Sequence, residues 1–597
     1  MTDVDDTMIL PQQRERAPVD LESHDIPTEL PVADLAEDDP ETGTAEKPGD
    51  NPGASDGHPP DDPGKPDDPG DRESEESGVR LAEESNTPAG KSIDQPTQLL
   101  ALDAIRAAEH AHADTADSIV ASAPVVGEHR ARERALAQLG WLASGLLMGA
   151  LGLLRIDRPG LWEDELAAWG MTTVRWDEVS DLLRLTDVVI APYYILLRGW
   201  TELVGDSDVM LRLPSVLAMA GSAAMIAALG SRLVSPRVGL LAGVLFALLP
   251  VTSRYAQEAR PYALTTFFAV LATLLLTRAF DRPKFWRWTA YTLAVALLGV
   301  LHPVALALLA GHGFAVLLTR ARLFWRWLPA AIVGAAPAAP LLYLGNSQKG
   351  QISWIPESNL DSLVAFPAKF FGVALLAGIV LALALFAISM QQPALVYTAW
   401  ALIPTAVIFG AGAITPLWTP RYLLFTLPAW ALLAATALGR APLVRGLVAM
   451  LVIAVVAVPA HRAMREQDGH GQDTRRLTAL LAAMASPGDG IVYGAPTTEG
   501  RVGRDIVARY IPEEKRPRDL LAKRKPRTEG RLSVAECVDY AACIGKTPRL
   551  WLVRIGEFRD PLARLATEKE RPLREYEVAK TWHPEGLTLS LLVRKPA

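Results

Sequence analysis

Residues 209–250 read VMLRLPSVLAMAGSAAMIAALGSRLVSPRVGLLAGVLFALLP, and this stretch decides the fold class. A helix needs about 20 mostly apolar residues to cross the hydrocarbon core of a bilayer. The stretch holds two such runs, separated by a short link that contains Arg232 and Arg237. It therefore predicts two consecutive membrane-spanning helices.

Similar apolar runs recur through the middle of the chain and predict an all-α polytopic membrane protein. About eleven spans are expected, near 137–154, 209–231, 237–254, 261–279, 288–301, 304–319, 327–345, 366–389, 394–412, 421–438 and 441–460. Arginines and lysines gather in every second link, which identifies that side as cytoplasmic. The region after residue 460 is therefore expected outside the cytoplasm.

Two segments require a choice. Residues 288–319 are apolar throughout and too long for one span, so we interpret them as a hairpin that turns at Pro303 and places His302 at the outer surface. Residues 188–204 are also apolar, but Pro192 and Arg198 interrupt them. We expect this second segment to lie in the outer interface.

The two ends of the chain differ from the middle. Residues 1–90 hold 26 Asp and Glu but only 6 Lys and Arg, with few aromatic residues. Such a composition cannot bury enough apolar surface to fold, so residues 1–135 are predicted to be a disordered acidic cytoplasmic tail. Residues 136–460 form the predicted membrane domain. Residues 461–597 mix helix and strand patterns and predict a small extracytoplasmic α/β domain.

Two features stand out within this last region. The stretch EEKRPRDLLAKRKPRTEGR, residues 513–531, is strongly basic; it is either a solvated loop or a binding site for an anionic glycan or lipid surface. Cys537 and Cys543 are the chain's two cysteines. Because an oxidising compartment favours disulfides, we predict that they are joined.

Charged residues at the outer ends of the spans are the candidates for chemistry, because burying charge in a membrane is costly. GLWEDELAAWG, residues 160–170, places Glu163, Asp164 and Glu165 together, which suits either a catalytic base or the polar face of an interfacial helix. SRYAQEARPYAL, residues 253–264, contains Arg254, Glu258, Arg260 and Tyr262. It suits either a salt-bridged turn or a phosphate and sugar site.

Two more groups belong to the same side. His302 is alone in its segment, and such a residue is more often a satisfied interfacial histidine than a ligand. TPLWTPRYLLFTLP, residues 415–428, places Arg421 and Tyr422 at the outer end of a span. Arg421 either extends to the interface or holds an anionic head group. The polar loop 346–363, with Trp354, is a candidate cover for a cavity.

As an ordered set, five stretches resemble the GT-C superfamily of membrane glycosyltransferases. Within it they are most similar to bacterial relatives of the dolichyl-phosphate-mannose protein mannosyltransferases and of the lipid A aminoarabinose transferase. The stretches are LWEDELAAWG, APYYILLRGWTELVGDSDVMLRLPSVLA, YAQEARPYAL, LHPVALALL and TPRYLLFTLPA, and the resemblance spans about residues 137–440. It implies a donor that carries a sugar on a polyprenyl phosphate, with mannose as the leading candidate for the sugar. It also implies inverting transfer to a hydroxyl of a cell-envelope glycan, lipid or protein at the outer face.

The resemblance also implies roles for individual residues. Its Asp-Glu pair matches Asp164 and Glu165, with Asp164 as the general base. Glu165 and Glu258 would orient the acceptor or hold a weakly bound divalent metal ion. The departing phosphate would be stabilised by Arg260, His302 and Arg421, and Tyr262 and Tyr422 complete the expected substrate-binding set.

Other classes of function are weighed against this one. A polytopic lipid or polysaccharide transporter would show internal repeats and helices broken near the middle of the bilayer, whereas the charges here gather at one face. An inactive scaffold for the outer domain is a further alternative. The sequence holds no phosphate-binding loop of the ATPase kind and no zinc-ligand spacing, and we expect no nucleic-acid partner.

Overall fold

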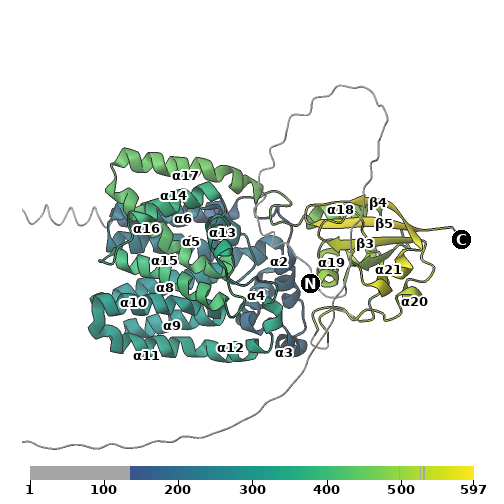
Figure 1. Cartoon of the computed structure of the whole chain (residues 1–597), viewed down its shortest axis with the longest axis horizontal. Coiled ribbons are helices and arrows are strands. Elements are labelled where there is room, and N and C mark those ends of the chain that lie inside the picture. The colour runs from purple at the N-terminus through teal and green to yellow at the C-terminus, as the bar shows by residue number, and fades with distance from the viewer. Residues whose placement is uncertain (1–134, 496–497, 525, 529–530, 597) are drawn as a thin grey trace, which may run out of the picture. The chain divides into compact units, whose positions relative to one another are not determined.

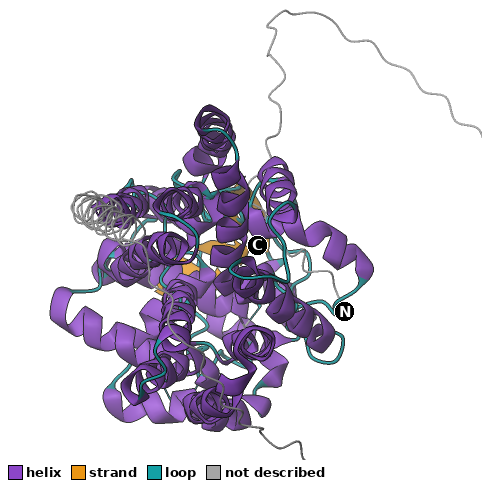
Figure 2. Ribbon diagram, turned by 90° about the vertical axis from the view of Figure 1, so that its left-hand side faces the viewer, coloured by secondary structure: helices purple, strands orange, loops and turns teal. Residues whose placement is uncertain are grey.

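The structure, a computed structural model, describes residues 135–495, 498–524, 526–528 and 531–596 (Figure 1). The acidic tail predicted for residues 1–135 therefore lies outside the described residues, except for Ala135, which begins the first helix, Ala135–Leu153. From there to Ala463 the chain is almost entirely helical. Figure 2 looks at this bundle mostly along its helix axes.

Three short elements follow the first helix, and a long series of membrane helices comes after them. The short elements are α2 (Glu163–Thr172), α3 (Trp176–Leu185) and α4 (Ala191–Val204). The series comprises α5 (Asp208–Leu233), α6 (Pro236–Leu248), α7 (Pro250–Ala256), α8 (Tyr262–Asp281), α9 (Phe285–Leu301), η2 (Pro303–Ala307), α10 (Leu308–Arg320), α11 (Phe324–Ala335), α12 (Ala339–Asn346), α13 (Leu360–Phe371), α14 (Ala374–Leu385), α15 (Ala394–Gly412), η6 (Pro420–Thr426), α16 (Leu427–Arg440) and α17 (Leu443–Ala463).

Each of the eleven expected span ranges is helical, but fewer helices qualify as spans by length and composition. Seven helices of the described residues do so, or nine if each of two bent pairs is counted as one span. The difference arises because α9 has only 17 residues and because Pro303–Asn346 counts as one candidate, although it contains two of the expected spans. The chain is thus a multi-pass membrane protein with seven to nine candidate spans.

Proline breaks place several loops at one rim of the bundle. Pro250 starts α7 directly after α6, and the two helices bend by 68°. His302 leaves the helical region with a φ of −158°, and Pro303 then begins η2. These breaks end the spans before the residues that carry charge, so Glu258, Arg260 and His302 come from turns rather than from straight helix interiors. The segment expected in the interface is α4, which is not among the candidate spans.

The C-terminal domain, from α18 (Thr474–Met484) onward, is built on a five-stranded mixed sheet. Its strands are β1 (Gly490–Tyr493), β2 (Arg518–Asp519), β3 (Arg549–Ile555), β4 (Tyr576–Trp582) and β5 (Leu587–Arg594), in the spatial order β2-β1-β3-β5-β4. β2, β1 and β3 are parallel, whereas β5 is antiparallel to β3 and β4. The remaining helices are α19 (Thr498–Tyr510), α20 (Tyr540–Ile544) and α21 (Thr567–Leu573).

The sequence patterns of this domain are confirmed. Residues 549–555, RLWLVRI, form β3, and the central residues of this strand are buried. Residues 587–594, LTLSLLVR, form β5. The structure also joins Cys537 and Cys543 by a disulfide, as predicted.

Candidate active site

The acidic cluster of residues 163–165 forms the first turn of α2, where carboxylates suit the positive end of the helix dipole. Successive helical residues point about 100° apart, so the three side chains face three different surroundings. Glu163 is 31% exposed and Asp164 23% exposed, whereas Glu165 is completely buried. The structure therefore separates three residues that look alike in the sequence.

Asp164 faces two arginines from distant parts of the membrane domain. Its Oδ2 accepts a hydrogen bond from Nη1 of Arg421 at 3.2 Å and lies 3.7 Å from Nε of Arg260. Burial alone would raise the pKa of the Asp164 carboxyl, but Arg260 and Arg421 outweigh it and hold this pKa below its ordinary value. Asp164 is therefore an ionised and partly exposed carboxylate.

Both arginines are held by further contacts. Nη1 of Arg260 donates to the Tyr194 hydroxyl at 3.2 Å, and that hydroxyl donates to Oδ2 of Asp187 at 2.8 Å. The Arg421 guanidinium lies over the ring of Trp354, 4.6 Å from its centroid. A guanidinium stacked on an aromatic face is held in a fixed orientation. The pair thus forms a fixed cationic site next to Asp164.

Glu258 lies near this group but inside the protein. Its Oε2 is 2.7 Å from Nη1 of Arg254, and its Oε1 has no hydrogen-bond partner among the described residues. Burial raises the pKa of Glu258 to about 7, against the opposing effect of Arg254. This carboxyl therefore changes charge near neutral pH.

Three rings gather around the arginines. The ring centroid of His302 lies 4.9 Å from that of Tyr422 and 5.5 Å from that of Tyr262, and the two tyrosine rings are 6.5 Å apart. The His302 side chain is only 6% exposed, so it is buried within this group of rings. Burial, with Arg260 and Arg421, lowers its pKa to about 3. His302 is therefore a neutral imidazole and not a third cation.

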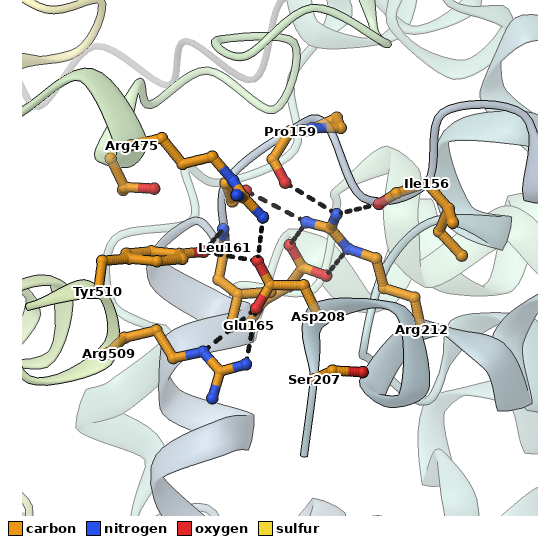
Figure 3. Close-up of polar contacts among 12 residues, drawn as sticks. Ile156, Pro159, Leu161, Glu165, Ser207, Asp208, Arg212, Arg475, Arg509 and Tyr510 are labelled. Atoms are coloured by element: carbon orange, nitrogen blue, oxygen red, sulfur yellow. Dashed lines mark hydrogen bonds and ion pairs between the residues drawn. The ribbon is translucent and has the colours of Figure 1, made fainter. Parts of the chain in front are cut away.

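Glu165 has a different environment from the one expected. Its two carboxylate oxygens accept hydrogen bonds from Nε and Nη2 of Arg212 at 2.8 and 2.6 Å (Figure 3). Oε1 also accepts the Ala259 backbone N–H at 3.0 Å. Arg212 donates further to the carbonyls of Ile156 and Pro159. With neither oxygen exposed, Glu165 is not placed to contact an acceptor or a metal ion. It ties α2 to α5 and to the turn before α8.

Sequence reasoning missed a second polar group, which joins the C-terminal domain to α5. Asp208 accepts from Arg475 at 2.7 Å, from Arg509 at 2.8 Å and from the Tyr510 hydroxyl at 2.9 Å (Figure 3). The Tyr510 oxygen also accepts the Leu161 backbone N–H at 2.7 Å. The sequence signal for this group was the presence of charged residues in α5 next to an apolar run, because a charged residue in a membrane span needs partners.

The donor set does not fit a metal ion. Among the residues that the structure describes, no group of three or more His, Cys, Asp and Glu side chains is arranged to hold one. The carboxylates that remain near the arginines, Glu163, Asp164 and Glu258, are each paired with an arginine. We therefore assign no step to a metal.

Part of the chain is similar to a known protein family. Residues 190–344, which include Tyr194, Glu258, Arg260 and His302, match the family described as dolichyl-phosphate-mannose-protein mannosyltransferase. No curated protein sequence matches the chain.

Two solved structures have a similar fold. ArnT from Cupriavidus metallidurans bound to undecaprenyl phosphate superposes with a TM-score of 0.51 at 15% identity, over 77% of this chain and 100% of that chain. The same protein in the apo state gives a TM-score of 0.50 at 14% identity, over 79% and 100%. Residues 190–344 are thus similar to this mannosyltransferase family, and the chain shares the fold of the ArnT membrane protein.

Proposed function

We propose that the chain transfers a sugar from a polyprenyl-phosphate donor to an acceptor hydroxyl, with Asp164 as the general base. One observation carries the proposal: an ionised, partly exposed carboxylate lies within 4 Å of two arginines whose other contacts are within the protein. A base beside a phosphate-sized cationic site is what this transfer requires. The similar ArnT structure holds undecaprenyl phosphate, which supports this class of donor.

The reaction is a single displacement at the anomeric carbon. The acceptor oxygen forms a bond to that carbon while its proton passes to the Asp164 carboxylate. The bond from the carbon to the phosphate oxygen breaks, and its electron pair remains on the polyprenyl phosphate. Attack from the face opposite the leaving group inverts the configuration. Mannose is the sugar proposed, and a cell-envelope glycan, lipid or protein supplies the hydroxyl.

Arg260 and Arg421 have a double role in this proposal. Their guanidinium groups stabilise the charge that grows on the departing phosphate, and this stabilisation is strongest in the transition state. The same guanidinium groups pair with Asp164 in the structure. A bound phosphate draws these donors away from the carboxylate, which leaves Asp164 more basic when the donor is in place.

The remaining residues support this centre. His302, Tyr262 and Tyr422 form an aromatic wall beside the arginines, and we propose that they contact the donor. Glu165, fixed by Arg212, acts as a positioning residue for α2. Glu258 regulates the local charge and does not take part in bond making.

The outer face is the proposed side of the reaction. The C-terminal domain contacts α2 and α5 beside Asp164, so the site and this domain share one side of the membrane. The division of the chain at residue 460 and the extracytoplasmic location of the domain are parts of the proposal. An alkaline phosphatase fused at the C-terminus should be active and a fused GFP dark; the reverse result would contradict the topology.

The activity is tested with a panel of radiolabelled undecaprenyl-phosphate-linked sugars and cell-envelope fractions. Membranes that contain the protein should incorporate label from one donor, and membranes from a deletion strain should not. Equal incorporation from every donor in both membranes would contradict a transferase and favour the transporter alternative.

A further inference from the structure

The C-terminal domain contacts α2 on the side that faces away from Arg212. Nη2 of Arg501, on α19, lies 3.7 Å from Oε1 of Glu163. The Glu163 backbone N–H donates to Oε1 of Gln472 at 3.0 Å, so the first turn of α2 is held by both its side chain and its backbone. Arg501 is nearly buried, at 10% exposure of its side chain. This pairing is therefore an interior contact between two parts of the fold.

A second contact holds the other end of the same helix face. Gly170 lies seven residues after Glu163, which places both on one face of α2. The Arg527 guanidinium occupies the position where a side chain at Gly170 would begin. Nη2 of Arg527 lies 2.6 Å from Oδ2 of Asp505, and Nη1 of Arg501 lies 3.4 Å from the same oxygen. Asp505 thus links the two arginines that contact α2.

Asp164 is the residue next to Glu163, so any rotation or shift of α2 moves its carboxylate. On one side α2 is fixed by the buried Glu165–Arg212 pair, and on the other by Arg501 and Arg527. A misplacement of about 1 Å at a reacting group can reduce the rate about 100-fold. The contacts of Arg501 and Arg527 with α2 therefore affect the position of Asp164, although neither arginine is proposed to contact a substrate.

We propose that Arg501 and Arg527 of the C-terminal domain are positioning residues for the transfer reaction, which clamp α2 and hold Asp164 between Arg260 and Arg421. The clamp rests on the proposed function for its catalytic meaning. Its mechanical part, the restraint of α2, is independent of any sugar. The catalytic part predicts that the C-terminal domain is required for turnover at a site formed mainly by the membrane domain.

Charge accompanies the mechanical restraint. Several charged and titratable groups face Asp164 from the elements around it. They are Glu163 on its own helix, Arg254, Glu258, Arg260, Tyr194, Tyr262, Arg421, Tyr422 and, from α19, Arg501. Arg501 is the one of these that belongs to the C-terminal domain. Its positive charge favours the ionised form of Asp164. Removing it should therefore raise the pKa of Asp164, whereas Arg501→Lys keeps the charge.

The restraint is tested by hydrogen exchange on the purified full chain. Arg501→Ala should increase the exchange rate of the α2 amides several-fold and leave β3 and β5 unchanged. The matched control is Arg504→Ala on the same helix, because Arg504 pairs with Asp519 and Glu536 of its own domain. The control should loosen the domain and not α2. Unchanged α2 exchange in Arg501→Ala, or equal effects of both variants on α2, would overturn the clamp.

A second pair of variants leaves the C-terminal domain intact. Gly170→Ala forces Arg527 to move, although alanine favours the helix itself more than glycine does. Gly199→Ala on α4 is the control, because a side chain there meets nothing within 4 Å. The assay is transfer from labelled undecaprenyl-phosphate mannose, or from the donor that the wild type uses. We expect the kcat of Gly170→Ala to be reduced about tenfold or more. The donor KM should stay unchanged, and Gly199→Ala should match the wild type.

The pH profile separates positioning from a general loss of fold. Arg501→Ala should move the acid limb of kcat to higher pH, and Arg501→Lys should restore it. An unshifted limb in Arg501→Ala, or wild-type kcat in Gly170→Ala, would overturn the catalytic part of the clamp. Failure of the proposed function has a different signature: Asp164→Asn would stay active while the exchange results on α2 still hold.

Discussion

Asp164 and Arg421 are 257 residues apart in the sequence, and Nη1 of Arg421 donates a hydrogen bond to Oδ2 of Asp164 at 3.2 Å. The pair joins α2 to the start of η6, the 3₁₀ segment that precedes α16. Because the same guanidinium is proposed to bind the donor phosphate, we expect it to leave the Asp164 carboxylate when the donor binds. Donor binding and activation of the base are then coupled through one side chain.

Asp164→Asn should reduce transfer by a factor of about 10²–10⁴, the usual cost of losing a general base. Asparagine keeps the shape but cannot take the acceptor's proton. Donor binding should become tighter, because one negative charge beside Arg260 and Arg421 is removed. Turnover and donor affinity measured on detergent-solubilised protein check both effects. Asp181→Asn on the exposed helix α3 is the control, and near-wild-type turnover in Asp164→Asn would remove the proposed base.

Arg421→Ala should raise the donor KM and lower kcat together, since Arg421 is proposed to meet the phosphate before and during bond breaking. Trp354→Ala keeps the charge but removes the ring under the guanidinium. Its expected effect is smaller, about tenfold at most on kcat/KM, consistent with a cation–π contact of about 1 kcal/mol. Rates against donor concentration for both variants test this order. An unchanged donor KM in Arg421→Ala would place the phosphate elsewhere.

Much of the fold was predictable because membrane spans are encoded locally. Apolar length located the helices, and the proline breaks near Pro250 and Pro303 located the turns that carry Glu258 and His302. The count of spans was less secure, since a 17-residue helix such as α9 is near the limit for crossing a bilayer. Strand patterns in the C-terminal domain were equally local, and β3 matches its sequence pattern.

The site was predictable only as a set of candidates. Asp164, Arg260 and Arg421, which the sequence named as candidates, do lie together, and their roles stay predictions. The partner of Glu165 was not predictable, because Arg212 lies 47 residues away within an apolar run and nothing local links the two. Arg501 was missed for a similar reason: it lies on a helix of the C-terminal domain, and only tertiary packing brings it to α2.

The buried pair of Glu165 and Arg212 should behave as a unit. Glu165→Gln leaves the Arg212 charge without its partner in a fully buried site, a change that typically costs about 3–5 kcal/mol. Arg212→Met leaves the Glu165 charge without its partner in the same buried site. The double variant Glu165→Gln/Arg212→Met should recover part of the loss, because no unpaired charge remains. Thermal unfolding midpoints in detergent for the two single variants and the double variant provide the measurement, and strictly additive losses would contradict the pairing.

Glu258 should make donor binding sensitive to pH near neutrality. Burial raises its pKa from the ordinary 4.5 to about 7, so the folded protein keeps this carboxyl protonated where an unfolded chain would ionise it. Stability that depends on Glu258 is therefore present below about pH 4.5 and is lost as the pH rises through about 7.

The same titration adds a negative charge near the proposed phosphate site. As the pH rises through about 7, the donor KM of the wild type should increase, because ionised Glu258 repels the phosphate and competes for the nearby arginines. Glu258→Gln should remove this step and keep the low-pH donor KM at higher pH. Donor KM measured between pH 5.5 and 8.5, the interval of about 1.5 units on either side of the titration, tests it. A step that persists in Glu258→Gln would assign the titration to another group, and a wild-type KM that falls over this interval would reverse the proposed sign.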